Sequence, residues 1–503
     1  MLAAIPSASV LGIDGHIVMV EVHVGHGLPA YGIVGLPDMV GRESKERVRA
    51  AILSSGLAWP QQRITVNLAP AIVRKTGAGL EAAIACGVLL ASEQLPPGGL
   101  EGTAVLGELG LDGRLRHVPG MLVLVDALAR RGVRRVVVPV ESAREAALCG
   151  GVEVLPAACL GDIHACARGE LPWPEVPPPT DDGCAAASTP GDDPPDLAEV
   201  RGLWHARRGL MACVSGGHHL LFVGPPGVGK TMLARRVPSI TMPLSRDHAF
   251  DVTRVHSAAG LAPAGALITR APFRAPHHTA SGAALVGGGS NGRVRIGEIT
   301  LASRGYLFLD ELGEFNPSVL DALRQPLEDR RVCVARAGLS VELPADFVLI
   351  ACTNPCPCGL GEHGCKCSEV QKTRYRRRLS APLLDRFDIR MVVDPPDPNQ
   401  PLGATSADTR AQIVAAQQIQ AERLRATPWR RNAEVPPGRL AKLAPLTEKA
   451  EATLLDIAEL RALSARGVGR LWRVARTLAD LDGVERVGED HVEEASWMRE
   501  DIL

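Results

Sequence analysis

One eight-residue motif constrains the fold of this 503-residue chain more than any other feature. Residues 224–231 satisfy the pattern G-x-x-x-x-G-K-[ST], and they lie between a strand-like apolar run and a run typical of a helix. Glycines in such a turn let backbone N–H groups surround phosphates, while the lysine supplies positive charge and the hydroxyl binds Mg²⁺. We therefore predict a nucleotide-binding site. The residues expected to bind the nucleotide or its Mg²⁺ are Gly224, Pro225, Pro226, Gly227, Val228, Gly229, Lys230 and Thr231.

A second motif, about 80 residues later, predicts the acidic part of the same site. Residues 307–309 are apolar and are followed directly by Asp310 and Glu311. Phosphoryl transfer requires positioning and charge neutralisation more than covalent chemistry. We expect Asp310 to bind the metal and Glu311 to polarise the attacking water.

Two further residues are candidates for a role in hydrolysis. Asn354 ends the next strand-like run, where its amide can orient water or contact the γ-phosphate. Arg386 carries a permanent positive charge suited to stabilising a transferring phosphate. An ordinary salt bridge from Arg386 to Asp385 or Asp388 is the alternative.

Periodicity and composition divide the chain into four parts. Strand-like and helix-like runs within 1–170 predict an α/β domain. Residues 171–199 contain eight prolines and seven acidic residues but no lysine or arginine, which predicts a linker. Strand-like runs alternate with helical segments in 200–400, and this alternation predicts a parallel sheet. Residues 401–503 are predicted to be helical.

Composition disfavours several classes of protein. The sequence contains no run of about 18 uncharged apolar residues and no basic, secretory-type start, so we expect no membrane partner and no secretion. The twelve cysteines favour a reducing, cytoplasmic setting. Aromatic residues are only 3% of the chain, too few for binding mainly by base stacking. From residue 200 onward basic residues exceed acidic ones by seven, which permits a polyanionic partner.

Four of the cysteines are clustered within twelve residues and are candidate metal ligands: Cys356, Cys358, Cys365 and Cys367. Four thiolates on a short glycine-rich loop suit a tetrahedral structural Zn²⁺ site. The C-x-C spacing is tighter than the usual C-x₂₋₄-C, and a reduced cluster that shapes the loop after Asn354 is the alternative. We favour the zinc site.

The motifs, in this order, resemble those of the magnesium-chelatase-like AAA+ ATPases of the ComM/YifB group. The shared segments are FRAPHHT (273–279), ALVGGG (284–289), GEI (297–299), NPCPCG (354–359), VARTLADL (474–481), YGIVGLPD (31–38) and VNLAPA (66–71). The resemblance covers nearly everything except the linker. It implies a Lon-protease-like (ribosomal S5-like) α+β domain, then an AAA+ parallel-sheet core with a channel-loop insert and a helical lid.

The resemblance also implies a homo-hexameric ring that binds ATP between subunits. It agrees with the roles above for Lys230, Thr231, Asp310 and Glu311. It makes Asn354 the first sensor and Arg386 a finger inserted into a neighbour's site. Arg466 matches the second-sensor position, where it would contact the γ-phosphate, with Arg470 and Arg473 as rivals. A solvated arginine at a helix start is the alternative for Arg466.

Two segments are similar to loops that project into the ring channel of the family. In the first, glycines 287–289 are expected to form a mobile tip. Arg293 and Arg295 are expected to contact the phosphate backbone of a nucleic acid. In the second, residues 330–343 predict a hairpin with Arg336 near its turn. Such contacts would be independent of base sequence and sensitive to salt. The alternative is that these arginines only solvate a hairpin.

A dense basic cluster at 372–378 contains one aromatic residue, Tyr375. The cluster is expected to contact either DNA or a neighbouring subunit. Its proximity in sequence to Arg386 favours the subunit interface.

The first domain is predicted to be non-catalytic. A working Lon domain needs a serine nucleophile and a lysine base. Matching 75–80 to the serine motif of the family places Gly79 at or next to the nucleophile, and matching 113–122 to the lysine motif places Leu122 at the base. Neither side chain can perform that chemistry, so we expect an interaction module and no peptidase.

The function implied by the resemblance is that of an ATP-driven DNA translocase. Such a ring would act as a helicase in branch migration, during homologous recombination and natural transformation, and recombination proteins are candidate partners. The alternative is a protein-remodelling ATPase like the magnesium chelatase motor.

Overall fold

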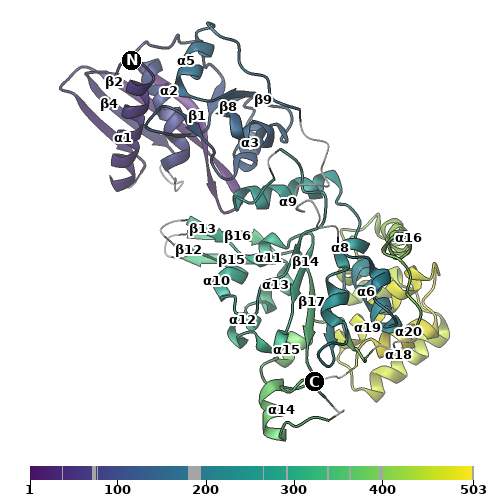
Figure 1. Cartoon of the computed structure of the whole chain (residues 1–503). Coiled ribbons are helices and arrows are strands. Elements are labelled where there is room, and N and C mark those ends of the chain that lie inside the picture. The colour runs from purple at the N-terminus through teal and green to yellow at the C-terminus, as the bar shows by residue number, and fades with distance from the viewer. Residues whose placement is uncertain are drawn as a thin grey trace.

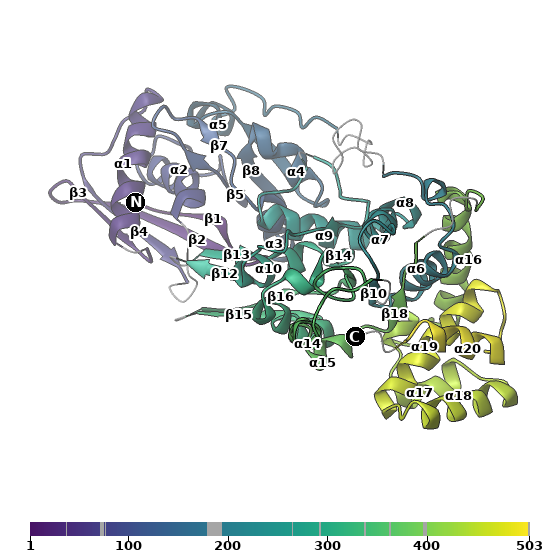
Figure 2. The same ribbon diagram turned by 60° about the horizontal axis from the view of Figure 1, so that its bottom comes forward.

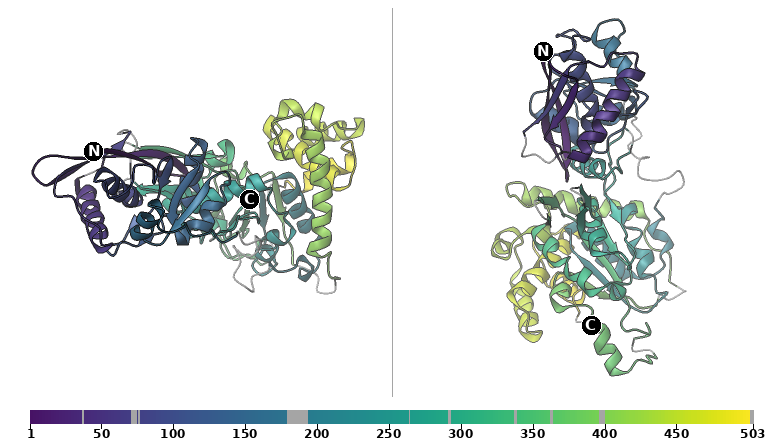
Figure 3. Two further views of the ribbon diagram at one scale, coloured as in Figure 1. Left: turned by 90° about the horizontal axis from the view of Figure 1, so that it is seen from above. Right: turned by 90° about the vertical axis from the view of Figure 1, so that its left-hand side faces the viewer.

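The computed structural model describes residues 1–36, 38–70, 75, 77–178, 194–263, 265–290, 293–336, 339–361, 364–395 and 400–500. An N-terminal lobe lies at one end of the molecule and a helical C-terminal region at the other, with a parallel sheet between them (Figure 1). Figure 3 shows the N-terminal lobe, the central domain and the C-terminal helices in two further views. No helix among the described residues is long and apolar enough to span a membrane.

The N-terminal lobe contains a four-stranded sheet in the order β1-β2-β4-β3. β3 and β4 are parallel and the other pairs are antiparallel. In β2, every second residue from Val18 to Val24 is buried, because one face of the sheet packs on helices and the other is open. The strands are β1 (Leu2–Leu11), β2 (Asp14–Gly25), β3 (Ala30–Val34) and β4 (Arg63–Ala69), and the helices are α1 (Asp38–Ser54) and α2 (Glu81–Ala91).

A second, smaller sheet completes this lobe. Its three strands are parallel, in the order β5-β8-β9, with a separate short hairpin of β6 and β7. The elements are β5 (Thr103–Val105), β6 (Glu108–Leu109), β7 (Leu115–Arg116), α3 (Met121–Arg130), β8 (Arg135–Pro139), α4 (Ala143–Ala147), β9 (Glu153–Ala157) and α5 (Leu160–Ala167). Helix α2 is apolar on all sides, which explains why nearly all of it is buried within the lobe.

The described ends of the predicted linker are packed against the folded parts. Trp173 packs on the N-terminal core. Residues 197–199 form a 3₁₀ helix whose Leu197 is fully buried in the core of the central domain. Most of the predicted linker, residues 179–193, lies outside the described residues.

The central sheet has five strands, all parallel, in the order β11-β14-β17-β10-β18. The strands are β10 (Leu220–Val223), β11 (Phe273–Arg274), β14 (Tyr306–Leu309), β17 (Val348–Thr353) and β18 (Ile389–Val392). Both faces are covered, since Leu220 and Phe222 join one apolar core while Leu221 and Val223 join the other. The predicted α/β class with a parallel sheet is confirmed.

Short helices and connecting segments surround the central sheet. Helices α6, α7 and α8 contribute to the core on the side of the C-terminal region, and α11, α12 and α15 contribute to the core on the opposite face. The helices are α6 (Trp204–Gly216), α7 (Lys230–Ala234), α8 (Val237–Ile240), α9 (Arg246–Ala258), α10 (Gly282–Val286), α11 (Glu298–Leu301), α12 (Pro317–Asp321), α13 (Arg324–Asp329), α14 (Glu369–Arg376) and α15 (Ala381–Leu384).

Two β-hairpins extend from the central domain in the same direction (Figure 1). They are β12 (Gly287–Ser290) with β13 (Arg293–Ile296), and β15 (Arg331–Arg336) with β16 (Leu339–Pro344), so the hairpin predicted at 330–343 is confirmed. The prediction that glycines 287–289 form a tip is wrong. They pair along β12 with Val294, Arg295 and Ile296. Gly287 has a φ of +104°, and an added Cβ there would lie 3.0 Å from the Arg295 carbonyl oxygen.

The C-terminal region is helical, as predicted, and packs on α6 through α16 and α19. Its helices are α16 (Ser406–Leu424), α17 (Pro437–Leu443), α18 (Glu448–Leu460), α19 (Ala465–Leu481) and α20 (Glu489–Trp497). Side-chain caps fix several helix starts, among them Thr405 and Ser464, which accept a hydrogen bond from the backbone of the first turn.

The N-terminal lobe contacts the central domain through α9, which lies at the junction in Figure 1. Arg254 of α9 pairs with Asp126 of α3 at 3.3 Å, and Ser257 donates a hydrogen bond to Glu145 at 2.5 Å. The turn between β1 and β2 packs on the second hairpin, where Gly12 approaches Val341. In Figure 2 the two hairpins lie on the side of the central domain that faces β1 and β2. Polar and apolar contacts therefore join the lobe to the hairpin face of the central domain.

Candidate nucleotide-binding site

The sheet topology brings three of the predicted motifs to one edge. β10, β14 and β17 are parallel, and β17 lies between the other two. The segments that follow these strands therefore meet at the carboxyl edge of the sheet, where ligands of open α/β sheets bind. A cavity of about 420 Å³ lies there and is lined by Pro226, Gly227, Gly229, Lys230, Thr231, Met232, Asp310, Glu311, Cys352, Thr353 and Asn354.

The phosphate loop follows β10 and ends where α7 begins, at Lys230. Gly227 and Gly229 have φ angles of +82° and +100°, which glycine adopts without strain. The Lys230 ammonium donates hydrogen bonds to the carbonyls of Gly224 and Pro225 at 2.6 and 2.7 Å. Burial lowers its pKa, and the Asp310 carboxylate partly opposes this effect. Lys230 is thus held at the floor of the cavity.

The acidic pair lies beside the phosphate loop. Thr231 Oγ1 donates a hydrogen bond to Asp310 Oδ1 at 3.2 Å, which places a hydroxyl and a carboxylate together. Oxygen ligands of this kind suit Mg²⁺, so the residues present fit that ion. Glu311 has a φ of +52° and points a half-exposed carboxylate at the cavity. This backbone conformation is strained for a residue other than glycine.

Asn354 faces Lys230 from the end of β17. Its Oδ1 accepts a hydrogen bond from the lysine ammonium at 3.3 Å. The phosphate-binding lysine and the predicted sensor amide are therefore in contact.

At this edge, His278 received no role from the sequence, and Tyr375 was predicted only as a member of the basic cluster. His278 Nδ1 lies 3.3 Å from Glu311 Oε2, and its ring meets Phe315 edge-on. The two histidines were visible in the segment FRAPHHT, but nothing in that segment indicated which of them would contact Glu311. Tyr375 is buried and shares a hydrogen bond of 3.1 Å with Thr353 Oγ1. The Tyr375 hydroxyl therefore contacts the end of β17, and its buried ring is not exposed for stacking on DNA.

Arg386 and Arg466 lie at the opposite edge of the sheet. Arg386 pairs with Glu328 at 2.8 Å and donates to the Pro382 carbonyl. Arg466 pairs with the same Glu328 at 3.1 Å and lies 3.7 Å from Asp385. The ionic partner of Arg386 is thus Glu328, a residue distant in sequence, and the alternative pairing with Asp385 or Asp388 is wrong.

A second cavity of about 420 Å³ marks this opposite edge. Its lining includes Arg386, Glu328 and residues at the amino ends of β10 and β17, among them His219 and Phe347. It shares no lining residue with the phosphate-loop cavity. Strands of four to six residues separate the two edges by roughly 13–20 Å. Within one chain, neither Arg386 nor Arg466 lines the site formed by its own phosphate loop.

The rival second-sensor residues belong to this opposite edge as well. Arg470 and Arg473 line the same cavity as Arg386. Arg470 also lies 3.6 Å from Asp388, which is buried and whose pKa is held low by His218 and Arg470 despite the opposing effect of burial.

The residues predicted to contact DNA are only partly within the described structure. Arg295 is exposed on β13, and it faces Gly288 across the hairpin. The side chains of Arg293 and Arg336 lie outside the described residues. In the basic cluster, Lys372 pairs with Glu369 at 2.8 Å and Arg378 with Glu314 at 3.2 Å.

The four clustered cysteines converge after β17. Their Sγ atoms all lie within 4.8 Å of one another.

In the N-terminal lobe, the two positions matched to the Lon nucleophile and base lie in apolar surroundings. Gly79 packs against Val118, and Leu122 is fully buried. Lys75, nearby in the sequence, is buried and donates to the Pro70 carbonyl at 2.6 Å.

Comparison with known families covers most of the chain. Residues 196–400 match the model for magnesium chelatase, subunit ChlI, residues 20–142 match a second model for subunit ChlI of Mg-chelatase, and residues 403–499 match the ChlI C-terminal model. Together the three models account for more than half of the sequence.

Relatives match over the full length. Uncharacterized protein Rv2897c of Mycobacterium tuberculosis is 41% identical over 98% of each chain. Competence protein ComM of Haemophilus influenzae is 37% identical over 99% of this chain and 97% of its own. Uncharacterized protein YifB of Escherichia coli is 37% identical over 98% and 96%. The chain therefore belongs to the ComM/YifB family of magnesium-chelatase-like AAA+ proteins.

Proposed function

We propose that this chain is the subunit of an ATP-driven DNA translocase, a ring helicase that promotes branch migration in homologous recombination and natural transformation. The observation that carries the ATPase part is the contact of Lys230 with Asn354 in a cavity that also contains Asp310 and Glu311. The DNA part is supported by Arg295, which is exposed on the first hairpin, and by the relative named Competence protein ComM.

Each residue of the cavity has a distinct task in this proposal. Lys230 exchanges its carbonyl partners for the phosphate oxygens of ATP. Thr231 and Asp310 hold Mg²⁺, which neutralises phosphate charge when bound. Glu311 orients the attacking water and accepts its proton, and Asn354 positions that water near the γ-phosphate.

Arg386 requires a second subunit in this proposal. The sheet separates it from the phosphate-loop cavity of its own chain, so its charge can stabilise the transition state only at a neighbour's site. Arg466 shares the partner Glu328 with Arg386, so we extend the same role in trans to Arg466. A hexameric ring places this edge of each subunit against the cavity of the next.

DNA binding is assigned to the face that carries the two hairpins. Both extend in one direction, and Arg295 on β13 is exposed. Contacts from such hairpins to the phosphate backbone are independent of base sequence and weaken as salt rises.

The experiment is ATP hydrolysis measured with and without duplex, forked and three-stranded DNA at two salt concentrations. We expect junction DNA to raise the rate several-fold at low salt, with a smaller rise at high salt. Arg295→Gln should reduce this stimulation, while Arg439→Gln, an exposed arginine of α17 far from the hairpins in the fold, should not. If every DNA fails to stimulate hydrolysis and a protein partner does so instead, the protein-remodelling alternative replaces this proposal.

A further inference from the structure

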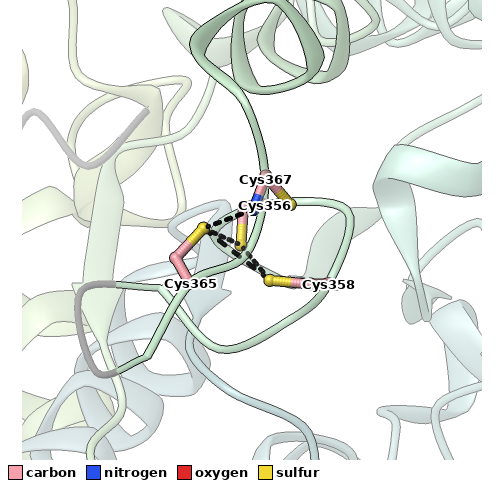
Figure 4. Close-up of side chains that lie close together, drawn as sticks. All are labelled: Cys356, Cys358, Cys365 and Cys367. Carbon is pink, nitrogen blue, oxygen red and sulfur yellow. Dashed lines mark hydrogen bonds between the residues drawn. The ribbon is translucent and has the colours of Figure 1, made fainter.

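The loop between β17 and α14 gathers four thiols around one point (Figure 4). Cys356 Sγ lies 3.3 Å from Cys358 Sγ and 3.7 Å from Cys365 Sγ, and the last two are also 3.7 Å apart. Cys367 completes the group, with all four sulfur atoms within 4.8 Å of one another.

The two 3.7 Å distances are close to the edge of a thiolate tetrahedron, and the 3.3 Å distance is shorter than that edge. Zn–S bonds of about 2.3 Å place the sulfur atoms of a tetrahedral site about 3.8 Å apart. A disulfide needs a sulfur–sulfur distance of about 2.05 Å, much shorter than the 3.3 Å between Cys356 Sγ and Cys358 Sγ. We propose that Cys356, Cys358, Cys365 and Cys367 bind one structural Zn²⁺, a site separate from the nucleotide cavity.

The surroundings of the sulfur atoms suit a negatively charged metal–thiolate centre. The backbone N–H of Cys367 donates to Cys365 Sγ at 3.4 Å. Four thiolates around Zn²⁺ carry two net negative charges. The main ionic partner of Lys372 is Glu369 at 2.8 Å, and smaller favourable effects of Cys365 and Cys356 also raise the pKa of this lysine.

The loop that the metal would close packs on the nucleotide site. Gly359 lies so close to the phosphate loop that an added Cβ would approach Pro226 Cδ to 2.8 Å. Its φ of +82° and a hydrogen bond from its N–H to the Cys356 carbonyl fix the turn between the first two cysteines. Asn354 precedes Cys356 by two residues. Zn²⁺ therefore holds a loop that supports both Pro226 and Asn354.

The test is the metal content of the full chain, purified without chelator and measured by inductively coupled plasma mass spectrometry. We expect about one zinc per chain. The double variant Cys358→Ser/Cys365→Ser should lose it, while Cys333→Ser, which removes an exposed thiol outside the cluster, should retain it. Zinc well below one per chain, or equal zinc in both variants, overturns the proposal.

A measurement on the unmodified chain covers the case in which the double variant does not fold. Titration with a mercurial reagent should release zinc in step with the loss of thiols, and Co²⁺ exchanged into the site should show the intense absorption of tetrahedral cobalt–thiolate. Release of zinc without thiol loss, or octahedral cobalt spectra, overturns the assignment.

Zinc removal should also weaken ATP binding several-fold. An unchanged affinity for ATP would refute the supporting role of the loop. A chain that binds zinc but ignores DNA leaves this inference intact and refutes only the proposed function.

Discussion

His278 and Glu311 are in contact at 3.3 Å, although 33 residues separate them in the sequence. β11 and β14 are neighbouring parallel strands, so the segments after them meet beside the phosphate loop. The backbone of Glu311 is held in a left-handed conformation, and we expect the neighbouring imidazole to orient its carboxylate.

His278→Ala is expected to lower kcat for ATP about tenfold and to leave KM for ATP nearly unchanged, because it removes orientation of the proposed base and no phosphate contact. His278→Asn, which retains a hydrogen-bonding group, should recover part of the rate. The matched control is His277→Ala, since the His277 ring lies beside that of His278, tilted by 34°, but His277 shares its hydrogen bond with Thr279. Steady-state kinetics of the three variants check the prediction. Equal losses in kcat for both alanine variants would contradict it.

Mixing two inactive variants should restore activity if sites are shared between subunits. Lys230→Ala removes the phosphate charge from a chain's own cavity, and Arg386→Ala removes the arginine at the opposite edge of the sheet. Each alone should lower hydrolysis at least 100-fold. In mixed rings, some interfaces combine an intact cavity with an intact arginine, so partial activity should return. Mass spectrometry should first show that the rings contain both variants. If ATP hydrolysis does not recover in such mixed rings, each site is complete within one chain.

Tyr375→Phe should weaken the support of β17 without affecting DNA binding. The variant loses one buried hydrogen bond to Thr353, with a cost of about 1 kcal/mol, and a few-fold loss of ATPase activity should accompany it. The control is Arg374→Gln on the same helix, an exposed residue. Differential scanning fluorimetry and DNA-binding titrations separate the effects. A loss of DNA affinity in Tyr375→Phe with unchanged thermal stability would count against the buried role.

Stability should fall between about pH 6.5 and pH 4 because of His219. Burial lowers the pKa of His219 to about 4, and Nδ1 accepts a hydrogen bond from the Leu349 N–H, which requires the neutral ring. The unfolded chain, with a histidine pKa near 6.5, binds the proton first as pH falls. The contribution of His219 is therefore complete above about pH 6.5 and is lost toward pH 4, a change of up to about 3 kcal/mol.

The check is the melting temperature at several pH values for the unmodified chain and for His219→Asn. The asparagine amide retains an acceptor for Leu349 but does not titrate in this range. Its melting temperature should change less between pH 7 and pH 5. Identical pH profiles would assign the acid sensitivity to other groups.

Much of the fold and of the phosphate-binding cavity follows from local sequence. Each component of the cavity is a short motif at the end of an apolar strand, and parallel strands with crossovers bring such ends to one edge. The contacts among Lys230, Thr231, Asp310 and Asn354 agree with that expectation. The four cysteines also carried a local signal, because a twelve-residue loop keeps its side chains close.

The glycine-rich segment 287–289 shows where composition misleads. Repeated glycine suggested a tip, yet these residues pair along β12, where an added Cβ on Gly287 would lie 3.0 Å from the Arg295 carbonyl oxygen. Glycine permits both conformations, and only the neighbours decide between them.

By itself, then, the sequence determined the strand ends, the phosphate loop, the acidic pair and the thiol cluster, all of which depend on residues close together along the chain. The tertiary structure decided that Glu328 pairs with both Arg386 and Arg466. It also decided that His278 contacts Glu311 and that the Tyr375 hydroxyl shares a hydrogen bond with Thr353 at the end of β17. These pairings join residues far apart in sequence, and no periodicity encodes them. They arise because packing the sheet and its helices brings certain side chains together at each edge.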